Sequence, residues 1–123
     1  MKSEDQKIKN GIVERSYDFA LRIVKFTRVF PKETAGFVLG KQLVASGTSI
    51  AANVEEAQGA FSKDDFTYKM QTAFKEALET NLWLRLVGDS GLIQNEELKY
   101  LLQESIEIKN ILGRIVKTSK IKK

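Results

Sequence analysis

The sequence lacks two residue types on which much protein chemistry depends. It contains no cysteine and no histidine among its 123 residues. The absence of cysteine excludes disulfides and thiolate metal sites, and it favours a cytoplasmic location. The absence of histidine excludes the usual general base, histidine-containing triads and the histidine ligands of zinc and di-iron sites. We therefore expect no enzymatic activity, no metal and no other cofactor.

Long apolar runs and helix breakers are also scarce. No run of about 18 apolar residues occurs, so the sequence predicts no membrane-spanning helix. The charged start, MKSEDQKIKN, is unlike a signal peptide. Pro31 is the single proline, and the apolar fraction of 42% and charged fraction of 29% are ordinary for a globular domain. We expect one domain over residues 1–123.

Four segments carry apolar residues at three- and four-residue steps, which is the pattern of amphipathic helices, and none alternates as a strand does. The predicted helices cover about residues 11–30, 35–60, 63–88 and 96–118. Pro31 should end the first helix, and Thr34, Ser62 and Asn95 are the expected N-caps of the others. Short connections make successive helices antiparallel. The expected fold is an all-α, up-down-up-down four-helix bundle.

In the first helix, Arg22 falls on the predicted wet face and Arg15 at its edge. The side chains expected in the core from this helix are Ile12, Val13, Tyr17, Ala20, Leu21, Ile23, Val24 and Thr27.

The segment QLVASGTSIAANVEEAQGA, residues 42–60, carries few large side chains. On a helical wheel, one stripe is apolar: Leu43, Ile50, Val54, Ala57 and Phe61. Ser46, Ser49 and Asn53 lie in the adjoining sector. Together these sectors cover about 200° with one charge, Glu56, whereas a core-facing stripe needs only about 100°. We therefore expect this helix to be buried on two sides.

Three interpretations of the Ser/Ser/Asn sector compete. It is a structural polar layer inside the bundle or at a subunit seam, a ligand or nucleic-acid groove, or a carboxylate metal or catalytic site. The first is favoured, because the nearby glutamates lack nitrogen ligands or a phosphate-binding motif. Glu76, Glu79, Asn81 and Arg85 are the natural partners on the third helix. The residues assigned to the layer or interface are Ser46, Ser49, Asn53, Glu56, Glu76, Glu79, Trp83 and Arg85.

Trp83 itself fits the core or an oligomer interface, where Trp and Arg often anchor binding. A base-stacking platform is the weaker interpretation, since no regular alternation of basic and aromatic residues surrounds it.

Basic residues gather at the C-terminal end. Residues 105–123 hold six Lys or Arg against one acidic residue. One interpretation is a polyanion partner contacted through its phosphates. The other is a solvated helix end, where lysines complement the helix dipole. The candidate nucleic-acid contacts are Arg114, Lys117, Lys120, Lys122 and Lys123.

Three stretches, FPKE, SGTSIAANVEEAQGAFSKDDF and AFKEALETNLWLRL, resemble in order and spacing the bacterial 23S rRNA intervening-sequence proteins, also called the S23 ribosomal protein family. The resemblance spans residues 30–93. It implies an antiparallel four-helix bundle that assembles into a ring-like homopentamer, and it brings no catalytic residues. A similar bundle is the accessory protein of diversity-generating retroelements, a basic pentameric barrel that binds nucleic acid and a reverse transcriptase.

Two positions depart from the family pattern. Many relatives carry arginine where this chain has Ala45, and glycine where it has Ala57. Without that arginine, the second helix is a weaker candidate for a basic nucleic-acid surface.

Two functions of different class follow. The first is a non-enzymatic homo-oligomeric scaffold that binds nucleic acid, with structured rRNA as the expected ligand. The alternative is a protein-binding adaptor whose oligomer docks a reverse transcriptase or another polymerase, since the second and third helices carry more uncharged surface than a bundle core requires. The expected partners are further copies of the chain, RNA or a protein, and no membrane.

Overall fold

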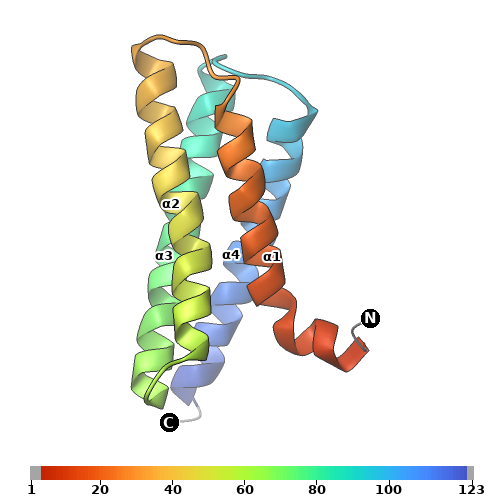
Figure 1. Ribbon diagram of the computed structural model, residues 1–123, viewed down its shortest axis with the longest axis vertical. Helices are drawn as coiled ribbons and strands as arrows, with labels where there is room; N and C mark the ends of the chain where they lie inside the picture. Colours follow the sequence, from red (N-terminus) through yellow and green to blue (C-terminus); the bar gives the residue numbers. More distant parts are fainter. Residues whose placement is uncertain (1–3, 122–123) are drawn as a thin grey trace.

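A computed structural model describes the backbone of residues 4–121 and the side chains of residues 11–121. All regular secondary structure in the described range is helical: α1 (Glu4–Thr27), α2 (Thr34–Gln58), α3 (Lys63–Asp89) and α4 (Glu96–Ile121). Successive helices reverse direction, so the α1–α2 and α3–α4 connections lie at one end and the α2–α3 connection at the other (Figure 1). Each helix packs on two neighbours, α1 and α3 both contacting α2 and α4. The prediction of an all-α four-helix bundle is confirmed.

Two of the predicted caps are present. Ser62 Oγ accepts a hydrogen bond from the Asp65 N–H at 3.0 Å, and the Asp65 carboxylate accepts one from the Phe61 N–H at 3.3 Å. Asn95 Oδ1 accepts from the Leu98 N–H at 2.9 Å. Each cap satisfies backbone donors that the first helical turn leaves free, so these side chains fix where α3 and α4 begin. α4 runs to Ile121, three residues beyond the predicted end at residue 118.

α1 ends earlier than Pro31 alone predicts, at Thr27 instead of Phe30. The Arg28 N–H bonds the Lys25 carbonyl and the Phe30 N–H bonds the Thr27 carbonyl, both at 3.2 Å, which tightens the chain into a turn. Phe30 is thereby brought against Phe26, with the ring centroids 5.1 Å apart and the rings nearly perpendicular. Burial of this edge-to-face pair favours the turn over another helical residue.

Both ends of α2 differ from the prediction. Glu33, and not Thr34, occupies the N-cap position, and its side chain makes no capping hydrogen bond. α2 ends at Gln58 with Gly59 as its C-cap, which agrees with glycine as a helix terminator. Phe61 therefore lies beyond the helix and is fully exposed, although the helical wheel placed it in the core.

The core draws on all four helices, but α1 contributes a different stripe from the predicted one. Phe19 and Phe26 are buried, whereas Tyr17 and Leu21, which were expected inside, are 56% and 42% exposed. Both sets recur at helical spacing, so the wheel of α1 alone did not distinguish them. The described core comprises Phe19, Ile23, Phe26, Phe30, Leu43, Ile50, Val54, Ala57, Met70, Ala73, Ala77, Leu84, Val87, Leu98, Leu101, Ile108, Leu112 and Val116.

The small residues of α2 allow close helix packing. A Cβ added at Gly47 would lie 3.0 Å from Ile23 Cγ2 on α1, and one at Gly36 would lie 1.9 Å from the Pro31 carbonyl oxygen. On its other side, α2 buries Ser46. The absence of bulky side chains in this helix therefore allows close contacts with α1 and α3 inside one chain.

No helix in the described range is long and apolar enough to cross a membrane.

Candidate nucleic-acid interface

A pair of buried hydroxyls joins α2 to α3. Thr80 Oγ1 lies 2.8 Å from Ser46 Oγ and 2.8 Å from the Glu76 carbonyl oxygen. Ser46 is 2% exposed and Thr80 is not exposed at all, so this chain of hydrogen bonds satisfies groups that water cannot reach. Thr80, which the sequence interpretation overlooked, takes the place of the expected partners.

One of those expected partners, Asn81, faces α4 instead, and Arg85 bonds to Asn81. Asn81 Nδ2 donates to Ser105 Oγ at 2.8 Å, and Ser105 Oγ donates to the Leu102 carbonyl at 2.8 Å. Arg85 Nε donates to Asn81 Oδ1 at 2.9 Å and thereby holds the amide in place. Asn81 therefore belongs to the α3–α4 contact, whereas the exposed Arg85 bonds within α3. Neither has a hydrogen bond to the α2 serines among the described residues.

The remaining residues of the predicted polar layer do not gather into one network. Ser49 and Asn53 are half-buried, and Asn53 Nδ2 donates within α2 to the Ser49 carbonyl at 2.8 Å. Glu56 is exposed and pairs with Lys69 at 2.8 Å. Glu79 is exposed. The buried part of the layer thus reduces to the Ser46–Thr80 pair.

The side of α3 beyond this pair carries two half-buried groups, Glu76 and Trp83. Burial, and secondarily the charge of Glu79, raises the pKa of the Glu76 carboxyl. The indole N–H of Trp83 is buried and finds no acceptor among the described residues. Ala45 and Ala52, which continue the Ser49 sector of α2, are exposed. We call these residues the α2–α3 face, and part of it stays uncovered in the single chain. No group of three or more potential metal ligands occurs there or elsewhere in the described residues.

α1 and α4 are joined by charged pairs. The Arg15 guanidinium bonds both carboxylate oxygens of Glu104 at 2.7 Å and one oxygen of Glu107 at 2.8 Å. Glu104 is 9% exposed, so its charge depends on this bidentate partner. The two carboxylates raise the pKa of Arg15, and Arg15 lowers the pKa of Glu107. Arg15 therefore acts as part of the bundle and leaves no charge free for a ligand.

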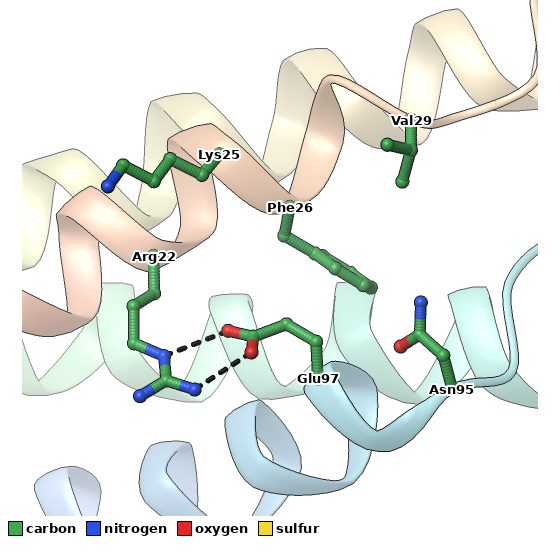
Figure 2. A pocket seen from close by; sticks show the side chains of 6 residues that line it. All are labelled: Arg22, Lys25, Phe26, Val29, Asn95 and Glu97. Atoms are coloured by element: carbon green, nitrogen blue, oxygen red, sulfur yellow. Dashed lines mark hydrogen bonds and ion pairs between the residues drawn. The ribbon is translucent and has the colours of Figure 1, made fainter.

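A second pair spans the same seam nearer the α3–α4 connection. Arg22 bonds both oxygens of Glu97 at 2.8 Å, and its guanidinium carbon lies 3.6 Å from the centroid of the Tyr100 ring. Figure 2 shows Arg22 and Glu97 pointing at one another beside a hollow of about 370 Å³, with the Lys25 side chain extending along α1 away from the pair. The hollow is lined by Arg22, Lys25, Phe26, Val29, Asn95 and Glu97. Since Arg22 and Glu97 satisfy one another and Asn95 caps α4, this hollow offers little for a ligand.

A larger hollow lies between α3 and α4, and we call it the α3–α4 groove. It measures about 590 Å³ and is lined by Phe74, Leu78, Lys109, Asn110, Gly113, Arg114 and Lys117. Among the described residues, its lining includes three cations and no acidic side chain. Arg114 also borders a neighbouring hollow of about 370 Å³ that contains Phe66 and Ile115. Positive charge thus surrounds an apolar surface on this side of the bundle.

The predicted nucleic-acid residues distribute unevenly over the structure. Arg114 and Lys117 line the α3–α4 groove, and Lys120 is exposed one turn further along α4. Lys122 and Lys123 lie outside the described residues. The sequence interpretation missed Lys109 and Asn110, because it treated the basic tail as one block. Lys109, Gly113, Lys117 and Lys120 share a helix face at three- and four-residue steps, and this spacing was the available signal.

Comparisons with known proteins agree with this architecture. The family model of the 23S rRNA-intervening sequence protein matches residues 9–114. A crystal structure at 1.70 Å of a protein of unknown function from the S23 ribosomal protein family of Bacteroides thetaiotaomicron VPI-5482 is 40% identical, with a TM-score of 0.80, over 86% of this chain and 98% of that one. No curated protein matches this chain significantly. The chain therefore belongs to the 23S rRNA-intervening sequence protein family.

Proposed function

We propose that this protein is a non-enzymatic, oligomeric RNA-binding protein that holds its ligand by the phosphates along the α3–α4 groove. The observation that carries the proposal is the lining of that groove, which includes Lys109, Arg114 and Lys117 and, among the described residues, no acidic side chain. Clustered charges of one sign raise the local concentration of a polyanion and release its counterions on binding. Such contacts position a nucleic acid without reading its sequence.

The groove differs from the paired charged sites of the bundle because no acidic side chain among the described residues lines it. Arg15, Arg22 and Lys69 are each within 2.8 Å of a glutamate oxygen. A phosphate at those sites would have to displace a carboxylate, whereas at the groove it meets exposed Arg114 and Lys117 directly. The groove is therefore the favoured phosphate site of the described surface.

Assembly of several chains is part of the proposal. The α2–α3 face is partly uncovered, and Leu82 and Leu86 lie one turn apart on the outside of α3, beyond the groove lining, each about two-fifths exposed. Covering either surface with a second copy would remove apolar area from water. Several grooves on one oligomer would then bind one RNA with an avidity that a single groove lacks. We place this complex in the cytoplasm, in keeping with a sequence free of cysteine.

The test is titration of fluorescent rRNA fragments at two salt concentrations. Three phosphate contacts per chain predict that the affinity falls roughly 20-fold or more between 50 and 200 mM salt. A variant with Lys109 and Lys117 both changed to glutamine should bind more weakly and show a shallower salt dependence. Undetectable binding at the lower salt concentration would remove the proposal.

A protein-binding adaptor is the second candidate, and the exposed leucine row of α3 favours it. Leu82 and Leu86 are 39% and 42% exposed and lie outside the groove lining. Exposed apolar rows of this kind are typical of protein contacts. Recovery of one defined protein after nuclease treatment, lost in a Leu82→Gln variant, would favour this function over RNA binding.

A further inference from the structure

The α3–α4 groove has a feature that phosphate binding does not require, an apolar floor. Phe74 is half-buried and Leu78 is 44% exposed, and both line the groove together with the cations. A surface that only neutralises phosphates needs positive charge and no accessible ring. The floor therefore indicates a ligand that combines negative charge with flat apolar surface.

Gly113 keeps α4 close to the Phe74 ring. A Cβ at this position would lie 3.2 Å from Phe74 Cε1, so even alanine would crowd the ring and a larger side chain would cover it. The groove of about 590 Å³ is open to solvent and has room for a group the size of a base on its surface. Asn110 at its border is exposed and carries an amide donor and an acceptor. These are the elements that stack a flat heterocycle and bond its edge.

Single-stranded nucleic acid matches this combination. Its phosphates fit the three cations, and its unpaired bases present faces that stack on aromatic side chains. A duplex presents the same phosphates but keeps the faces of its bases stacked inside. An acidic amphipathic helix would match the charge, but it presents no flat heterocycle to the Phe74 ring.

We propose, resting on the RNA-binding function above, that the α3–α4 groove binds single-stranded nucleic acid in preference to duplex, with an unpaired base against Phe74 and Gly113 and flanking phosphates on Lys109, Arg114 and Lys117. The base contributes affinity through stacking, and the cations contribute affinity that does not depend on strandedness. The groove thus selects unpaired segments within a structured RNA.

Fluorescence anisotropy at one salt concentration tests this preference with three probes of equal length: a single strand, its duplex and an abasic strand that keeps the phosphates. We expect the single strand to bind at least about 10-fold more tightly than either of the others, since stacking of one base is worth that factor. Phe74→Leu should remove most of the preference and leave duplex binding unchanged. The matched control Lys117→Gln should weaken single strand and duplex by similar factors and keep the preference.

The outcomes separate the two proposals. Equal binding of single strand and duplex, or of normal and abasic strands, would overturn the selection of unpaired bases while leaving phosphate binding intact. Binding of none of the three probes would remove the RNA-binding function and this inference with it. An acidic amphipathic peptide that binds the groove when no oligonucleotide does would assign the floor to a protein partner. The abasic comparison uses the unaltered protein, so it holds even if Phe74→Leu fails to fold.

Discussion

The charged residues on the two sides of α4 differ in whether they are paired within the bundle. Toward α1, Glu97, Glu104 and Glu107 are bonded to two arginines at 2.7–2.8 Å. Toward α3, Lys109 and Lys117 line a groove that no acidic side chain of residues 11–121 lines. The first arrangement holds two helices together, and the second leaves positive charge available to a ligand. The lesson is that the helix that a basic residue faces, and not the net charge of its segment, decides whether its charge is paired within the bundle.

The largest effect is expected where the charged pair is most buried. Arg15→Ala would leave the buried Glu104 carboxylate without its bidentate partner, which should lower the free energy of unfolding by about 2–3 kcal/mol. Lys117→Ala on the groove side should change it by less than about 0.5 kcal/mol. Urea denaturation of both variants measures the difference. Similar losses in the two variants would break the distinction between the two sides of α4.

The groove side should respond to charge in binding and not in stability. Reversing Lys109 and Lys117 together to glutamate should weaken RNA binding more than 10-fold at low salt, because it removes two phosphate contacts and adds two repulsive charges. The control is Lys32→Glu with Lys41→Glu, which makes the same change in net charge at exposed positions outside the groove. Equal losses in the two double variants, measured by anisotropy, would show that net charge alone governs binding.

A smaller effect is expected at the second arginine of the seam. Arg22→Lys keeps the charge but loses the two-point contact with Glu97 and the contact over Tyr100. Both members of the pair are about two-fifths exposed, so the loss of unfolding free energy should be only about 0.5 kcal/mol. Thermal denaturation at low and high salt measures it. A loss as large as that of Arg15→Ala would contradict the role assigned to burial.

The smallest effects concern pH, and they have opposite signs at the α1–α4 seam and on the α2–α3 face. Arg22 and Arg15 lower the pKa of Glu97 and Glu107 below the ordinary 4.5, so the folded state binds fewer protons there and loses stability as pH falls below that value. Burial raises the pKa of Glu76 above 4.5, so the folded state binds more protons and gains stability as pH falls through that range.

Glu76→Gln removes the cost of a half-buried carboxylate and should therefore stabilise the protein slightly at neutral pH, with the benefit disappearing near pH 4. Glu55→Gln, which removes one carboxylate at an exposed position on α2, is the matched control. Denaturation midpoints at pH 7 and pH 4 decide the matter, and a Glu76→Gln variant less stable at pH 7 would refute the assigned sign.

Local sequence signals predicted the fold well where one short segment contained all the information. Ser62 and Asn95 cap α3 and α4 because each side chain needs only the N–H three residues later. Phe30 was misplaced, since its position follows from packing on Phe26 and not from the proline after it. Tyr17 and Leu21 were placed in the core because α1 carries two apolar stripes at helical spacing. Packing against the neighbouring helices determines which of the two stripes is buried.

Predicting the candidate site required knowing how neighbouring helices pack on one another. A helical wheel of one helix does not give that information. Arg22 was placed on the wet face, yet it bonds Glu97 on α4. Ser46 was expected to meet a charged or amide side chain, but the register of α2 on α3 sets it opposite Thr80. Arg114 and Lys117 were found from composition alone, whereas Lys109 required the groove to be seen.

Lysine acetylation followed by mass spectrometry, with and without bound RNA, tests the central claim most directly, because it reports each amino group in the unaltered protein. RNA on the α3–α4 groove predicts that acetylation of Lys109, Lys117 and Lys120 slows several-fold while Lys25 and Lys41 react as before. Uniform slowing at all five, or slowing confined to Lys25 and Lys41, would contradict the assignment of the groove as the RNA site.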